Sequence, residues 1–166
     1  MKEILEDVLS PGMSVVFCGT AVGATSARRG AYYAGPGNKF WETLFKVGLT
    51  PTQLKPEQYR SATTLGIGFT DVAKTISGND NILRRAHFGT DALHGKIEKF
   101  SPKVVAFTSK RAAKEFLGRP VQYGLVQEQV GQSRLFVLPS PSGAACRWWE
   151  IKFWHELATL VTNATS

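Results

Sequence analysis

Short apolar runs, each followed by a loop rich in glycine, serine or proline, restrict the fold of this chain more than any other feature. Residues 14–18 (SVVFC), 104–108 (VVAFT) and 135–138 (LFVL) are typical of strands buried on both faces. Residues 66–72 (GIGFTDV) form a fourth expected strand. Segments with helical spacing separate the runs, at 3–9, 39–47, 84–100, 109–117 and 147–162. Strands that alternate with helices predict an α/β domain with a mainly parallel sheet.

Three polar loops are expected at one edge of this sheet. Residues 19–37, 70–82 and 139–147 each follow a predicted strand and are rich in Gly, Ser, Pro, Asn or Asp. In open α/β sheets, ligands bind at the carboxyl ends of the strands. We therefore expect these loops to build the pocket.

Composition narrows the class of protein. The 166 residues include 20 Lys and Arg against 13 Asp and Glu, and the net charge of +7 favours a polyanionic partner such as nucleic acid. Two cysteines and three dispersed histidines predict neither a metal nor another cofactor, and they fit a reducing cytoplasm. We found no apolar run of the ~18 residues that a membrane helix needs, no signal-peptide pattern and no linker. We expect a monomeric, cytoplasmic protein (at the nucleoid in a bacterium) with a single domain over residues 1–166 and no membrane partner.

Several residues in these loops could carry chemistry. Gly19 begins GTAVG, where glycines let backbone N–H groups approach a ligand; a plain tight turn is the alternative. Tyr33 lies in a Gly/Pro loop and could stack on a flat base. Asp71 ends a buried strand, where a carboxylate needs partners or a shifted pKa, so it is a candidate base; a loop carboxylate that caps backbone N–H groups is the alternative. Asn38 is a candidate site residue or a helix N-cap.

The last loop, SPSGAACRWW (residues 140–149), could grip phosphates and insert small side chains into a duplex. The alternative is a turn between strand and helix, with Trp148 and Trp149 in the core.

In this order, four segments resemble the uracil/thymine DNA glycosylase superfamily, most closely its mismatch-specific members. Those members carry G-I-N-P-G, Y-x-G-P-G-N-x-F-W, G-I-G-F-T-N and a final P-S-S/G loop. This chain has GTAVG (19–23), YAGPGNKFW (33–41), GIGFTD (66–71) and PSPSG (139–143). The resemblance spans about residues 13–160 and implies a three-layer α/β/α sandwich with a short, mostly parallel central sheet.

The resemblance also implies roles for individual residues. Tyr33 would stack on a base flipped out of DNA, while Gly19, Thr20 and Ala21 would form the floor of the pocket. Asp71 matches a second pocket residue that reads the edge of the base. The remaining expected contacts are Thr70 and Ser140 to the substrate, and Ser142, Gly143, Ala144, Ala145 and Arg147 to DNA in the loop that enters the minor groove.

Two departures from the family pattern affect catalysis. Ala21 stands where the family has an Asn or Asp that positions the attacking water, and Ala cannot orient or deprotonate water. Asp71 stands where Asn is frequent, and an ionised Asp accepts hydrogen bonds but donates none. Asn38 matches an essential Asn of a related branch that acts on hypoxanthine and uracil. Asp71 and Asn38 are therefore the expected catalytic residues.

Other branches of the superfamily fit less well. The iron–sulfur branches need four cysteines, which this chain lacks, and the branch with a catalytic His before its final Pro-Ser-Pro has Leu138 or Ser140 here. The sequence predicts a monofunctional DNA glycosylase that removes uracil, with hypoxanthine, xanthine or mismatched thymine as further candidates, and so initiates base excision repair. A module that only binds damaged or abasic DNA is the first alternative, favoured by Ala21, and a nucleotide-binding protein unrelated to DNA is the second.

Overall fold

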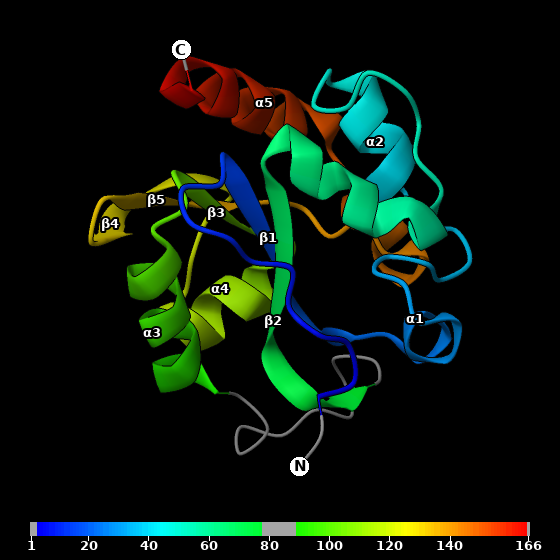
Figure 1. Cartoon of the computed structure of the whole chain (residues 1–166), viewed down its shortest axis with the longest axis horizontal. Coiled ribbons are helices and arrows are strands. Elements are labelled where there is room, and N and C mark those ends of the chain that lie inside the picture. Colours follow the sequence, from blue (N-terminus) through cyan, green and yellow to red (C-terminus); the bar gives the residue numbers. More distant parts are fainter. Residues whose placement is uncertain (1–2, 78–88, 166) are drawn as a thin grey trace.

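A five-stranded sheet forms the centre of the molecule (Figure 1). The structure is a computed structural model that describes residues 3–77 and 89–165. The strand order is β2-β1-β3-β5-β4. The strands are β1 (Val15–Val22), β2 (Ile67–Ser77), β3 (Val104–Phe107), β4 (Gly124–Val130) and β5 (Ser133–Val137). All neighbouring pairs are parallel except β4 with β5, so the predicted mainly parallel sheet is confirmed.

Helices cover both faces of the sheet. They are α1 (Ala24–Arg29), α2 (Phe40–Lys46), α3 (Thr90–Phe100), α4 (Lys110–Leu117) and α5 (Ile151–Thr165), with 3-10 segments η1 (Pro56–Leu65) and η4 (Gly143–Trp148). One hydrophobic cluster joins α2, η1 and α5 to one face, and a second joins α3 and α4 to the other. This is the three-layer α/β/α arrangement that the sequence predicts.

Successive side chains of the strands belong alternately to these two clusters. Val15 and Phe17 of β1 belong to the first cluster, whereas Cys18 belongs to the second. In a strand, successive side chains point to opposite faces. Because both faces are covered, both sets must be apolar, which explains the continuous apolar runs in the sequence.

The N-terminal segment differs from the prediction. We expected a helix over residues 3–9, but Val8 instead forms an isolated antiparallel bridge to Phe69 of β2. The two residues exchange N–H···O bonds of 2.9 and 3.0 Å, and the Ile4 N–H donates to the carbonyl of Lys74 at 2.9 Å. A helix of so few residues is marginal, whereas the edge strand β2 offers backbone groups that need partners.

Gly68 permits this close approach. A Cβ on Gly68 would lie 2.4 Å from the carbonyl oxygen of Val8 and 2.5 Å from the sulfur of Met13. The glycines of the GIGF segment are therefore partly structural.

Other boundaries also differ from the sequence-based expectation. The loop expected at 19–37 contains the end of β1 and helix α1, and the one expected from residue 70 is strand until Ser77, with 78–82 outside the described residues. The last helix begins at Ile151 rather than 147, and α3 begins at Thr90, while 84–88 fall outside the described residues. Strand β4 and segment η1 were not predicted. Within the described ranges, no helix is long and apolar enough to cross a membrane.

Candidate functional site

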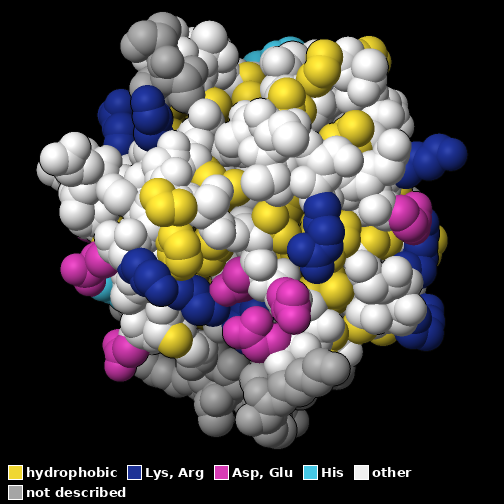
Figure 2. Space-filling view, viewed as in Figure 1, with side chains coloured by type: hydrophobic (Ala, Val, Ile, Leu, Met, Phe, Trp, Pro, Cys, Tyr) yellow, Lys and Arg dark blue, Asp and Glu magenta, His cyan; other side chains and the backbone are white. Residues whose placement is uncertain are grey.

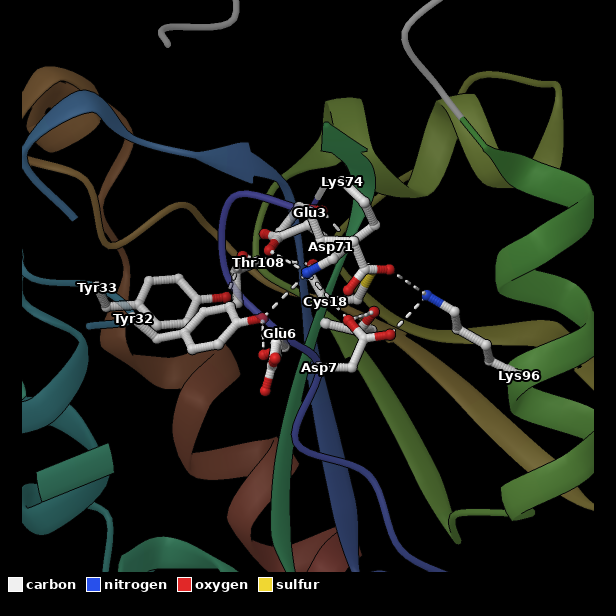
Figure 3. Close-up of polar contacts among 12 residues, drawn as sticks. Glu3, Glu6, Asp7, Cys18, Tyr32, Tyr33, Asp71, Lys74, Lys96 and Thr108 are labelled. Carbon is white, nitrogen blue, oxygen red and sulfur yellow. Dashed lines mark hydrogen bonds and ion pairs between the residues drawn. The ribbon is translucent and has the colours of Figure 1, made fainter. Parts of the chain in front are cut away.

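Strands β1 and β2 bring the first candidate residues together. Gly19 is the parallel register partner of Asp71. A Cβ on Gly19 would lie 2.8 Å from Asp71 Oδ1, 3.5 Å from the hydroxyl of Tyr33 and 3.6 Å from Oγ1 of Thr108. Asp71, Tyr33 and Thr108 therefore converge on the backbone of Gly19, within β1 and β2 and just past the end of β3. Figure 3 shows these three side chains near one another.

Asp71 is buried and electrostatically unusual. Its exposed fraction is only 4%, and its Oδ2 lies 3.4 Å from the ammonium of Lys74. Burial raises the pKa of Asp71 from 3.8 to about 7, although the charge of Lys74 opposes the shift. A carboxyl group with a pKa near neutrality can exist in both protonation states at physiological pH, as acid–base chemistry requires.

Lys74 connects Asp71 to the N-terminal segment. Its Nζ lies 3.0 Å from Asp7 Oδ1 and donates to the hydroxyl of Tyr32 at 3.1 Å. Asp7 in turn accepts from Thr70 at 2.8 Å and from Lys96 at 2.5 Å. The result is a chain of alternating charges behind the site, buried at Asp71 and partly exposed at Lys96 (Figure 3).

Tyr33 borders the site with its ring held in place. Its hydroxyl shares a 3.0 Å hydrogen bond with Thr108, and its ring stacks on Phe40 with centroids 3.9 Å apart and planes 14° apart. Its φ of 55° lies in the left-handed region, which is uncommon for a residue other than glycine and can mark a functional position. Phe40 covers one face of the ring, so a ligand can stack only on the other.

A surface cavity of about 450 Å³ lies apart from Gly19 and Tyr33. Its lining residues come from the N-terminal segment and α3: Asp7, Leu9, Ala92, Gly95, Lys96, Lys99 and Phe100. It touches the charged chain at Asp7 and Lys96 but contains none of the predicted site residues.

The family model described as the uracil DNA glycosylase superfamily matches residues 6–160. The chain belongs to this superfamily. Among solved structures, it resembles a solution NMR structure of a candidate uracil DNA glycosylase from Methanosarcina acetivorans. The two share 19% identity and a TM-score of 0.64, over 98% of this chain and 97% of that one. At this identity the structural likeness supports the fold alone, and membership of the superfamily rests on the match to the family model.

The GTAVG segment was expected directly after the first strand, but most of it lies within that strand. Gly19, Thr20 and Ala21 are residues of β1, which ends at Val22, and Thr20 is buried. Thr70 neighbours Asp71 on β2, but its hydroxyl donates to Asp7 and so supports the charged chain.

Asn38 precedes Lys39, the N-cap residue of α2. Its Oδ1 accepts the N–H of Phe40, the first residue of α2, at 2.9 Å. The side chain therefore closes a turn one residue before the N-cap position, so Asn38 is not the N-cap that the sequence offered as the alternative. The amide oxygen is thus engaged, and any contact with a substrate would fall to Nδ2.

The loop after β5 packs against the segment that carries Asn38. The N–H of Lys39 donates to the carbonyl of Pro141 at 2.8 Å. Ser140 accepts from the N–H of Ser142, and Ser142 caps η4 through the N–H of Ala144, both at 3.2 Å. Two motifs far apart in the sequence therefore form one surface.

Alanine at Gly143 should separate these two motifs. A Cβ there would lie 2.8 Å from the carbonyl oxygen of Pro36 and 3.4 Å from backbone atoms of Gly37. We expect Gly143→Ala to lower the free energy of unfolding by about 1–3 kcal/mol, because backbone atoms cannot easily give way. Chemical denaturation measures this, with Gly35→Ala as control, since a Cβ on Gly35 meets nothing within 4 Å. Equal stability of the two variants would contradict the packing.

The sequence did not single out three residues of this region. Trp148, considered as a core residue in the alternative interpretation, is 60% exposed, and the Arg147 guanidinium lies 5.2 Å from its ring centroid. Lys74 and Thr108 contact Asp71 and Tyr33 directly. The signal for Thr108 was its place as the last residue of a predicted strand, whereas exposure of one tryptophan in a Trp-Trp pair has no sequence signal.

Proposed function

We propose that this chain is a monofunctional DNA glycosylase that flips a deaminated base, uracil first, out of DNA and hydrolyses its N-glycosidic bond. Membership of the superfamily supports a DNA glycosylase. The observation that carries the finer proposal is the buried Asp71 carboxyl, with a pKa near 7, next to Tyr33 and the backbone of Gly19.

The carboxylate favours bases that present an N–H group. Ionised Asp71 accepts hydrogen bonds and donates none, so it suits N3–H of uracil or thymine and N1–H of hypoxanthine. Cytosine presents an acceptor at N3 and would leave the buried charge unpaired. Tyr33 offers the ring face away from Phe40 for stacking.

The hydrolysis needs a positioned water that Ala21 cannot hold. In our proposal, Oδ1 of Asp71 or the amide of Asn38 orients this water. Its oxygen bonds to C1′ of the sugar while the C1′–N bond breaks, and the base leaves with the bonding electrons. The bound water gives up one proton to the surrounding solvent, which leaves a hydroxyl on C1′, and the departing base takes one proton up. Positioning and preorganised donors supply much of such a rate enhancement without a strong base.

Lys74 is unsuited to strand cleavage through a Schiff base. Nearby Asp71 and Asp7 raise the pKa of its ammonium although burial opposes the shift, and Nζ contacts Asp7, Asp71 and Tyr32. A protonated amine has no lone pair for attack on an abasic-site aldehyde, which supports hydrolysis alone.

Contact with DNA would fall to the loop after β5. On the face in Figure 2, the Lys and Arg side chains lie in separate groups, with acidic side chains both below the centre and at the edges, so this face carries no continuous basic patch. Arg147 and Trp148 are exposed on η4, next to the loop that carries Tyr33 and Asn38. An aromatic side chain there suits the space that a flipped base leaves in the stack.

We expect Trp148→Ala to weaken binding to an abasic duplex by about tenfold, because base–aromatic stacking contributes roughly 1–3 kcal/mol per base. Fluorescence anisotropy at fixed salt measures the affinity. Phe45→Ala is the control, since Phe45 is also exposed (45%) but lies on α2. If both variants bind as the wild type does, Trp148 has no such role.

A base-release panel tests the proposed function. Single- and double-stranded oligonucleotides with uracil, hypoxanthine, xanthine or mismatched thymine are incubated with the protein, and abasic sites are then cleaved with alkali. Strand breaks for uracil after alkali, none without it, and no covalent adduct with borohydride are expected. The absence of breaks for every base would refute the proposal.

A damage-binding module is the second candidate. Ala21 at the water-positioning site and the engagement of the Asn38 amide oxygen by the N–H of Phe40 favour it. Tight, salt-dependent binding to an abasic duplex without release of any base would select this function over the first.

A further inference from the structure

Lys74, which contacts Asp71, lies outside every motif that the superfamily resemblance assigns. We propose that Lys74, anchored by Asp7, is a positioning residue that holds one oxygen of Asp71 so that the other faces the base site as an ionised acceptor. This inference rests on the proposed function, because it assigns a purpose to the charge of Asp71.

The ammonium of Lys74 is fully engaged. Its three partners are Asp7 Oδ1 at 3.0 Å, the hydroxyl of Tyr32 at 3.1 Å and Asp71 Oδ2 at 3.4 Å. An ammonium has three protons, and the geometry offers one acceptor for each. The Lys74 side chain is only 11% exposed, so water competes little for these contacts.

Asp7 fixes the far side of this ammonium. Its Oδ1 accepts from Lys74 and Thr70, while its Oδ2 accepts from Lys96 of α3. These contacts keep the pKa of the Asp7 carboxyl below its ordinary value in spite of burial. The backbone bond from Ile4 to the carbonyl of Lys74 holds the segment in place. The N-terminal segment thus supplies a permanent negative charge behind the site.

The two oxygens of Asp71 have different surroundings because Lys74 contacts one of them. Oδ2 faces Lys74, whereas Oδ1 faces Gly19, 2.8 Å from the position of a Cβ there. The hydroxyls of Tyr33 and Thr108 border the same point. Oδ1 is therefore the oxygen that is placed to meet a base or a water.

Titratable and charged groups face Asp71 from all the elements around it. They are Lys74 on β2, Asp7 on the N-terminal segment, Cys18 on β1, Tyr32 and Tyr33 before α2, and Lys96 on α3. Of these groups, Lys74 and Lys96 favour the ionised form of Asp71, and Lys74 is the one in contact with it. Loss of Lys74 should therefore raise the pKa of Asp71 above 7, and loss of Asp7 should lower it, because Asp7 is a like charge.

Opposite shifts in a pH profile test this inference. Base release from a uracil oligonucleotide is measured between pH 5 and 9, and the titration of the Asp71 carboxyl is followed by ¹³C NMR. In Lys74→Met, we expect the rising limb of the pH–rate profile to move to higher pH by about one pH unit. Release at pH 7 should then be about fivefold slower, because a smaller fraction of Asp71 is ionised. Lys74→Arg restores most of the rate. In Asp7→Asn, the limb moves to lower pH.

Lys99→Met is the control, because it also removes a lysine but lies exposed on α3 outside this network. Its profile should match that of the wild type. An unchanged Asp71 titration in folded Lys74→Met, or an upward shift in Asp7→Asn, would overturn the inference. If Lys74→Met does not fold, Asp7→Asn and Lys74→Arg decide it. Failure of the proposed function is distinct, since no base is then released by the wild type while NMR still reports both shifts.

Discussion

Asp71→Ala is expected to slow the release of uracil by about 100-fold or more. A positioned acid or base contributes typically ~10²–10⁴-fold, and in our proposal Asp71 also holds the edge of the base. Alanine removes both contributions and leaves the ammonium of Lys74 without one of its partners. Single-turnover release from a uracil oligonucleotide measures the effect.

Asp91→Ala provides the matched control for this experiment. Asp91 is exposed in the first turn of α3, and its removal should leave the rate of base release unchanged. A folded Asp71→Ala variant that releases uracil at the wild-type rate would show that Asp71 is not catalytic. Asn38→Ala would then become the decisive variant.

The contribution of Asp71 to the free energy of unfolding should fall as pH rises from 4 to 8. The pKa of Asp71 is raised from 3.8 to about 7 on folding, so between these values the folded state binds a proton that the unfolded state has lost. Stability decreases with pH wherever the folded state binds more protons. A shift of about three units corresponds to about 4 kcal/mol, reached as pH passes 7.

Asp71→Asn isolates this contribution, because the amide keeps the shape of the side chain and does not titrate. We expect the variant to gain stability over the wild type progressively from pH 4 to 8, as measured by urea denaturation at each pH. Asp91→Asn should track the wild type, because Asp91 is exposed. A constant difference between Asp71→Asn and the wild type across this range would mean that Asp71 does not titrate there.

The link between Asp71 and Lys74 illustrates what strand periodicity could not predict. Residues three apart on a strand point to opposite faces. Here the register between β1 and β2 shifts between Ala21 and Val22, after the pair Ala21–Ala73. Such an irregularity redirects side chains, and it lets Lys74 reach Asp71.

Elements with a weak or misleading hydrophobic pattern could not be predicted from the sequence either. Strand β4 (GLVQEQV) is buried only at its two ends and at no position between them, so it carries no run of apolar residues. The N-terminal residues have helical spacing, yet the open edge of β2 offers them backbone partners. In both cases, hydrogen bonding to an adjacent strand of the sheet determines the backbone conformation, and the secondary-structure preference of the local residues does not.

The sequence by itself predicted the α/β class and four of the five strands, and its resemblance to the superfamily implied the three layers and a pocket formed by Gly19, Tyr33 and Asp71. Buried parallel strands must be apolar on both faces, and their carboxyl ends must lie at one edge of the sheet. Short apolar segments and the loops after them can therefore be recognised in the sequence alone. Only the tertiary structure decided that Lys74 and Asp7 stand behind Asp71, that the Asn38 amide oxygen binds the N–H of Phe40 and that Trp148 is exposed. The contacts of this network join residues as much as 89 positions apart, as between Asp7 and Lys96, and depend on distances that no local pattern encodes.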